Sequence, residues 1–332
     1  MGRPTTVALT LGAGGARGYA HIGVIEALEE RGYEIVTVAG TSMGALVGGL
    51  HATGSLQAYA DWARTLTQRD VLRLLDPTLR GPGAIRATKV FAKVAELLGD
   101  VRIEDLPIPY TAVATDLLAG KEVWFQRGPL APAIRASIAL PRFITPVVIG
   151  GRLLADGGMM NPIPVAATAA TPADLTIAVS LAEEHVTGRN KPATNVSSSL
   201  EELEDVDEAA VSETTSLLDS ERVRSLVDWF TDGRLDPQAP VDHEPVEDAP
   251  EDWGLQPPPA GLRTRDVMQL SLDALQGVVT RYRLAGYPPD LLVTIPRAAC
   301  RTFDFHRASE LIALGRDRML EALDGERSTP WA

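Results

Sequence analysis

The order apolar strand, glycine-rich turn, helix occurs twice near the start of the chain. The apolar run Val7–Leu11 is typical of a buried strand, and the glycine cluster Gly12–Gly18 and a helical pattern follow it. A second short apolar strand is expected at Ile35–Ala39, followed by the turn Gly40–Gly44 and a helix of small residues. Each unit leads a strand directly into a helix, so the pattern predicts an α/β fold with a largely parallel sheet.

The same alternation continues along the chain. Further elements are expected as strands at Tyr110–Thr115, Val123–Phe125, Leu175–Leu181 and Leu291–Ile295, as helices at Ala131–Leu140 and Arg307–Leu323, and as a hairpin with a Gly-Gly turn between Val147–Ile149 and Leu153–Leu154. Strands that alternate with helices over this length predict a layered α/β domain.

Acidic residues are concentrated in one segment. Residues 183–252 contain 20 acidic and 5 basic residues, whereas the remainder contains 24 acidic and 26 basic residues and is nearly neutral. High charge and many prolines favour disorder, so residues 183–261 are predicted to form a largely disordered insert. Apolar residues near 217–230 can still form one face of a short amphipathic helix. The insert divides a single domain made of residues 5–182 and 262–323.

Composition also excludes several classes of protein. No run reaches about 18 uncharged apolar residues, so no transmembrane helix is predicted, and no signal peptide is recognised. The single cysteine, Cys300, rules out an intrachain disulfide and indicates a reducing compartment. The nearly neutral part of the chain lacks the basic face that nucleic acid requires, but it can approach an anionic membrane. We therefore expect a cytoplasmic protein without a nucleic-acid partner, able to contact the inner face of the membrane; the sequence leaves its oligomeric state open.

Two functions are compatible with the glycine cluster alone. The spacing of Gly12, Gly14 and Gly18 is similar to a dinucleotide-binding turn, which would indicate an oxidoreductase. A glycine-rich loop can also offer its N–H groups to an anion formed during hydrolysis. The dinucleotide fingerprint needs a third glycine where this chain has Arg17, and an acidic residue where it has Gly40. The hydrolase interpretation is therefore favoured.

The second turn, Gly40-Thr41-Ser42-Met43-Gly44, is a G-x-S-x-G pentapeptide. It lies between a predicted strand and a predicted helix, which is the context that a nucleophile elbow requires. Ser42 would then lie at the N-terminus of a helix, where the helix dipole favours developing negative charge. The motif predicts Ser42 as the nucleophile of a hydrolase.

With these motifs the sequence resembles the patatin-like phospholipase family, in particular its bacterial members. Three blocks match in order, namely Gly12-Ala13-Gly14-Gly15-Ala16-Arg17-Gly18, Gly40-Thr41-Ser42-Met43-Gly44 and Asp156-Gly157-Gly158. The similarity covers residues 5–182 and, more loosely, 262–323. The resemblance implies a three-layer α/β/α fold with a mainly parallel central sheet.

The resemblance also implies a role for each block. In that family the serine is the nucleophile and the aspartate completes a Ser–Asp dyad, here Ser42 and Asp156. The first block is the oxyanion hole, whose donors would come from Gly14, Gly15, Ala16 and Arg17. The motif glycines are Gly12, Gly18, Gly40, Gly44, Gly157 and Gly158. Gly14 and Gly15 are expected because no Cβ would block the approach of the substrate carbonyl.

A dyad requires Asp156 to accept the serine proton directly. A free aspartate, with a pKa of about 3.9, is a poor base at neutral pH, and burial would raise that pKa. The five histidines are His21, His51, His185, His243 and His306, and none lies in a context that suggests a triad. Asp116 is expected to cap a turn instead of acting as a second acid, and Asn161-Pro162 is expected to begin a helix.

The sequence therefore predicts a serine hydrolase that cleaves acyl esters of lipids, of the phospholipase A or lysophospholipase type, with no metal and no cofactor. Its expected substrate partner is a lipid or a lysophospholipid. Two alternatives stay open. One is a general carboxylesterase or thioesterase that acts on soluble esters, and the other is a non-catalytic lipid-binding scaffold.

Overall fold

The computed structural model describes residues 3–75, 83–85, 87–183 and 264–327. The chain divides into two compact units, residues 1–188 with 270–332 and residues 189–269. Of the second unit, only residues 264–269, the start of one helix, are described. The predicted insert at 183–261, with its helix near 217–230, lies outside the described residues apart from Glu183.

The first unit is built on an eight-stranded sheet in which five strands are parallel. The parallel strands, in spatial order, are β10 (Leu291–Pro296), β9 (Leu175–Glu183), β1 (Thr6–Leu11), β2 (Glu34–Thr41) and β4 (Tyr110–Asp116). The remaining strands pair in the antiparallel direction: β5 (Lys121–Phe125) pairs with β4, β8 (Arg152–Asp156) pairs with the last part of β4, and β7 (Val147–Ile149) pairs with β8. The predicted α/β class, the mainly parallel sheet and the position of each predicted strand are confirmed.

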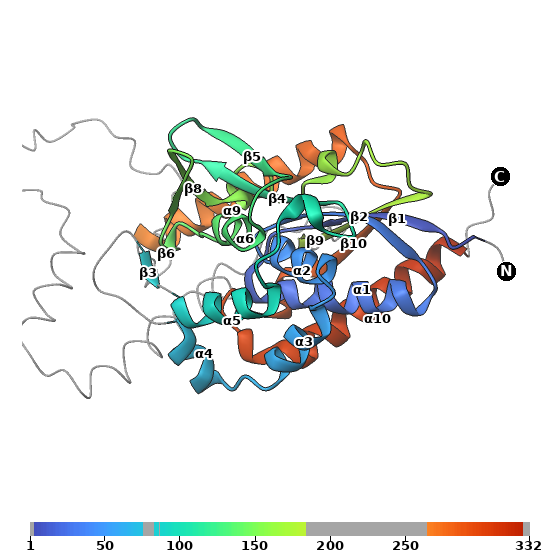
Figure 1. Ribbon diagram of the computed structural model, residues 1–332, viewed down its shortest axis with the longest axis horizontal. Coiled ribbons are helices and arrows are strands. Elements are labelled where there is room, and N and C mark those ends of the chain that lie inside the picture. The colour runs from blue at the N-terminus through green and yellow to red at the C-terminus, as the bar shows by residue number, and fades with distance from the viewer. Residues whose placement is uncertain (1–2, 76–82, 86, 184–263, 328–332) are drawn as a thin grey trace, which may run out of the picture. The chain divides into compact units, whose positions relative to one another are not determined.

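The described helices lie on both faces of this sheet (Figure 1). They are α1 (Ala20–Glu30), α2 (Met43–Ala52), α3 (Leu56–Arg64), α4 (Gln68–Leu75), α5 (Thr88–Leu98), α6 (Leu130–Ser137), α9 (Thr264–Gly286) and α10 (Ala308–Arg327). Short 3-10 turns lie at η1 (Gly15–Tyr19), η2 (Ile103–Asp105), η3 (Gly157–Met159), η4 (Val165–Ala167), η5 (Arg297–Ala299) and η6 (Phe305–Arg307), and β3 (Gly83–Ile85) pairs with β6 (Arg142–Ile144) in a separate two-stranded sheet. No helix in the described ranges is long and apolar enough to cross a membrane.

Successive side chains of β9 point to opposite faces of the sheet. Ile177 and Val179 belong to the large core beneath α1, α2 and α10, whereas Ala178 packs with Ile163 and with Leu284 of α9 on the opposite face. One prediction in this region is wrong. Asn161-Pro162 begins no helix, because the chain is held there in a turn and the next helical residues are the 3-10 turn from Val165.

Strands β2 and β8 meet end to end along β4. The first part of β4 pairs in parallel with β2, up to Thr41 opposite Val113. The last part pairs with β8 in the antiparallel direction, starting with Asp156 opposite Ala114. The two strands therefore run toward each other and finish beside consecutive residues of β4. This register places Asp156 beside Ser42, the residue that follows Thr41, although the two residues are 114 positions apart in the sequence.

Helices α1 and α10 cross at two glycines. A Cβ on Gly23 would overlap the carbonyl oxygen of Ile312, and a Cβ on Gly315 would overlap that of Ala20. The helix backbones therefore touch, and this contact holds the start of α1 next to the glycine loop.

We expect Gly315→Ala to lower the free energy of unfolding by at least the roughly 1–3 kcal/mol typical of overpacking. Gly325→Ala in the same helix is the matched control, since a Cβ there meets no atom within 4 Å and alanine favours a helix over glycine by about 1 kcal/mol. Denaturant unfolding of both variants measures the difference. Equal stability of the two variants would contradict the close helix contact.

Candidate active site

Ser42 lies on a strained turn between β2 and α2. Its backbone has φ 57° and ψ −124°, a conformation with positive φ that a non-glycine residue adopts only under constraint. A Cβ on Gly40 would overlap the backbone of Gly44, and a Cβ on Gly44 would overlap the carbonyl of Leu11. The two glycines of the pentapeptide therefore let β1, β2 and α2 approach closely enough to form the elbow.

A second serine fixes this turn. The N–H of Ser42 donates to Oγ of Ser137 at 2.9 Å, and that hydroxyl donates to the carbonyl of Val113 at 2.6 Å. Ser137 is fully buried at the end of α6. No motif in the sequence points to Ser137, because its role depends on α6 lying against the end of β2.

The structure brings Ser42 and Asp156 into direct contact. Oγ of Ser42 donates to Oδ2 of Asp156 at 2.5 Å, and the two residues are 7% and 2% exposed. The other carboxylate oxygen accepts the N–H of Gly158 at 2.7 Å, and the carbonyl of Asp156 accepts the hydroxyl of Thr115 at 2.9 Å. A Cβ on Gly157 would overlap the carbonyl of Val113, so the turn after Asp156 also depends on glycine.

Burial changes the acidity of this carboxyl group. Loss of solvent raises the pKa of Asp156 to about 6, although the hydrogen bonds from Ser42 and Gly158 favour the ionised form and oppose the rise. The group is then mostly ionised at neutral pH but holds a proton far better than a free aspartate. It is suited to accept a proton from a bound hydroxyl.

Two histidines of the described residues, His21 and His51, contact groups other than Ser42. Nε2 of His21 lies 2.8 Å from the carbonyl oxygen of Gly12, and burial lowers the pKa of His21 to about 4. Nδ1 of His51 lies 3.7 Å from the carboxylate of Glu29. Asp116 caps the turn that follows β4 by accepting the N–H groups of Leu118 and Ala119, as expected.

The glycine loop offers fewer free donors than expected. The N–H of Ala16 donates to the carbonyl of Thr302 at 2.9 Å, so this expected oxyanion donor is already used. The N–H groups of Gly14 and Gly15 have no acceptor within the described residues. The guanidinium of Arg17 donates to the carbonyls of Gly14 and Arg297, at 3.3 and 3.0 Å, so it holds the loop in place.

Packing, more than substrate access, explains these glycines. Gly15 has φ +56°, and a Cβ there would lie 2.6 Å from the carbonyl oxygen of Thr302. A Cβ on Gly14 would lie 2.6 Å from the side chain of Leu181, and one on Gly12 would lie 2.8 Å from the carbonyl of Val179. A Cβ on Gly18 would overlap the side chain of Met43. The loop is thus pressed against β9, α2 and the segment at Thr302.

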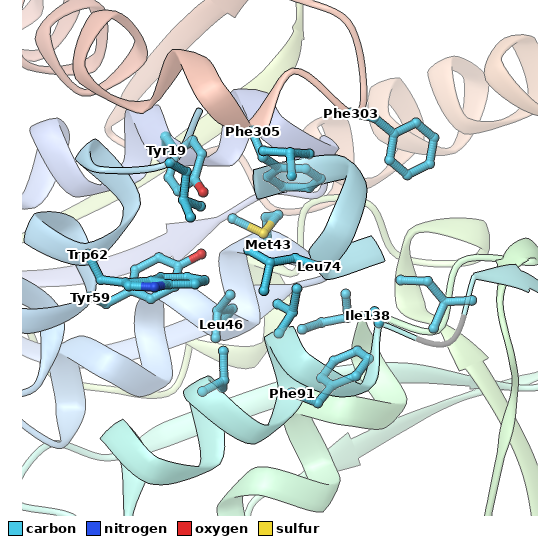
Figure 2. Close-up of a pocket in the computed structure, with 16 residues that line it drawn as sticks. Tyr19, Met43, Leu46, Tyr59, Trp62, Leu74, Phe91, Ile138, Phe303 and Phe305 are labelled. Atoms are coloured by element: carbon cyan, nitrogen blue, oxygen red, sulfur yellow. The ribbon is translucent and has the colours of Figure 1, made fainter. Parts of the chain in front are cut away.

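An apolar cavity of about 80 Å³ is lined in part by Met43, the residue that follows Ser42. Figure 2 shows aromatic side chains from several elements around this space, together with the aliphatic side chains of Met43 and Leu46 from α2. Met43 directly follows Ser42, and Ile138, also in the lining, directly follows Ser137. The residues that directly follow Ser42 and Ser137 therefore belong to the wall of this cavity.

The chain is similar to several known proteins. Residues 9–169 match the patatin-like phospholipase family. An NTE family protein of Mycobacterium tuberculosis is 49% identical over 341 residues, which cover 96% of this chain and 91% of that protein. Human patatin-like phospholipase domain-containing protein 6 is 35% identical over 190 residues, or 55% of this chain and 14% of that protein. Neuropathy target esterase sws of Drosophila persimilis is 37% identical over 166 residues, or 48% of this chain and 12% of that protein.

The layered sheet defines an α/β protein, and the chain belongs to the patatin-like phospholipase family. Within that family, its similarity to the mycobacterial NTE family protein extends over almost the whole chain. This membership supports lipid ester hydrolysis in general terms.

The raised pKa of Asp156 predicts a pH-dependent stability. An unfolded aspartate titrates near pH 3.9, whereas burial raises the pKa of Asp156 to about 6 in the fold. The protonated carboxyl therefore favours the folded state fully below about pH 4, and this contribution is lost as pH rises through about 6. Asp156→Asn cannot titrate, so the stability of the wild type relative to this variant should fall between pH 4 and pH 8. Unfolding in urea measures it, and a pH-independent difference would contradict the raised pKa.

Proposed function

We propose that the protein is a serine hydrolase that cleaves acyl esters of lipids, of the phospholipase A or lysophospholipase type, through Ser42 and Asp156. The observation that carries this proposal is the 2.5 Å hydrogen bond from Oγ of Ser42 to a buried carboxylate. The pKa of that carboxyl group, about 6, suits a base at neutral pH.

The reaction follows from the positions of these groups. Oγ of Ser42 attacks the ester carbonyl carbon while Asp156 accepts its proton. The N–H groups of Gly14 and Gly15 are the free donors for the oxyanion, because Ala16 is bonded to Thr302. Collapse of the tetrahedral intermediate expels the alcohol, which takes the proton from Asp156. Water, deprotonated by Asp156, then attacks the acyl-serine, and the released serine recovers its proton.

The apolar cavity beside Met43 supports a lipid acyl chain as the group transferred to the serine. Burial contributes about 0.8 kcal/mol for each CH₂ removed from water, so longer chains gain affinity there. The same cavity disfavours a carboxylesterase or thioesterase specific for small soluble esters. A lipid substrate is also consistent with action at the inner face of the cytoplasmic membrane, which is part of this proposal.

A fluorophosphonate probe tests the nucleophile. The wild type should be labelled on Ser42, and Ser42→Ala should fold but not react. Asp156→Asn keeps the shape of the side chain but cannot accept the proton, so both labelling and hydrolysis should fall by about 10²–10⁴-fold. Labelling of Ser42→Ala at the wild-type rate would refute the assignment, and circular dichroism checks that each variant is folded.

A substrate panel separates the alternatives. p-Nitrophenyl esters of increasing chain length, a lysophospholipid and a diacyl phospholipid in vesicles are compared at equal concentration. The proposal predicts that kcat/KM rises with chain length and that a phospholipid is cleaved. Preference for the shortest ester would favour the soluble carboxylesterase, and vesicle binding without labelling or hydrolysis would favour the scaffold.

A further inference from the structure

Asn161 ends the turn that begins at Asp156. It is fully buried. Its N–H donates to the carbonyl of Gly157 at 2.8 Å, and its own carbonyl accepts the hydroxyl of Thr41 at 2.9 Å. Since Thr41 precedes Ser42, Asn161 joins the backbone on the aspartate side of the site to the backbone on the serine side.

The side chain of Asn161 is held by Glu122. Nδ2 of Asn161 donates to Oε2 of Glu122 at 2.6 Å, and Nε1 of Trp124 donates to the same oxygen at 3.0 Å. Oε1 of Glu122 accepts from Arg283 of α9 at 3.2 Å, and Arg283 also donates to the carbonyl of Met160 at 3.4 Å. The side chains of Glu122 and Arg283 are each 25% exposed. One carboxylate therefore binds donors from the turn, from β5 and from α9.

The amide of Asn161 is oriented by this carboxylate. Oδ1 of Asn161 is buried and has no hydrogen-bond partner within the described residues. An ionised carboxylate only accepts hydrogen bonds, so the NH₂ group of Asn161 must face Glu122 and Oδ1 must point elsewhere. A buried acceptor without a partner destabilises the fold, so the contact with Glu122 has to offset that cost.

Glu122 also lies one register position away from the aspartate. Glu122 pairs with Thr115 across β5 and β4, and the hydroxyl of Thr115 donates to the carbonyl of Asp156 at 2.9 Å. Thus Thr115 holds Asp156 at the start of the turn, and Glu122, through Asn161, holds the end of it.

We infer that Glu122 is a positioning residue, which keeps the turn from Asp156 to Asn161 in the geometry that aims the carboxylate at Ser42. This inference rests on the proposed function. Misplacement of reacting groups by about 1 Å can cost roughly 10²-fold in rate, so a loss of this support is expected to lower kcat. Neither Glu122 nor Asn161 lines the apolar cavity beside Met43, so KM should change little.

The test measures kcat, KM and the rate of Ser42 labelling by a fluorophosphonate in Glu122→Ala and Glu122→Gln. Loss of the supporting group should lower kcat and the labelling rate by up to about 100-fold, with KM little changed from that of the wild type. The smaller loss is expected for glutamine, which retains one acceptor oxygen, and this variant carries the test should the alanine variant fail to fold. Glu104→Ala is the matched control, because Glu104 also accepts a loop N–H, that of Gly128 at 2.7 Å, and pairs with Arg102.

The outcomes separate this inference from the proposed function. A wild type that is not labelled on Ser42 would refute the proposed function. A labelled wild type with Glu122→Gln at the wild-type kcat would overturn the positioning role alone. A loss of kcat in Glu104→Ala equal to that in the Glu122 variants, or a loss that appears in KM instead of kcat, would also overturn it.

Discussion

The site depends on how β4 changes partner halfway along its length. β2 ends opposite Val113 and β8 ends opposite Ala114, so the ends of two strands that run in opposite directions share one edge of β4. Ser42 follows the first end and Asp156 is the second, which is why their side chains meet at 2.5 Å. A serine hydroxyl and a carboxylate are thus held by the ladder hydrogen bonds of the sheet core, which explains how so short a contact persists without a third residue between them.

Close backbone packing is the second requirement. Gly40, Gly44 and Gly157 occupy places where a Cβ would overlap neighbouring backbone. Together they allow the backbones of β1, β2, β4 and the start of α2 to lie in close contact around Ser42 and Asp156. This packing leaves Asp156 only 2% exposed, and that burial raises its pKa to about 6. Packing and acid–base chemistry therefore have one physical cause.

Local patterns in the sequence predicted the elements that carry the motifs. The apolar runs at Val7–Leu11 and Ile35–Ala39 are buried strands, and the turn at Ser42 leads into a helix, because these features depend on neighbouring residues. The pairing of Ser42 with Asp156 came from resemblance to a family, since the register of β4 involves contacts distant in sequence. Contacts between residues distant in sequence also define the roles of Ser137 and Glu122 and the hydrogen bond from the Ala16 N–H to Thr302, so none of these could be predicted from local patterns. Helices α3 to α5, which help to line the cavity, carry no motif and were not predicted.

The central claim is that buried Asp156, and no histidine, accepts the proton of Ser42. The pH dependence of kcat/KM for a p-nitrophenyl ester tests it most directly, in the wild type and in a variant with His51, His185, His243 and His306 changed to glutamine. His21 is kept, because it holds Gly12 and its pKa, about 4, lies too low to account for a transition near pH 6. Since an ionised base is required, both proteins should gain activity as pH rises, with one midpoint near 6. Loss of activity in the variant, or a midpoint that moves away from 6 when the histidines are removed, would contradict the account.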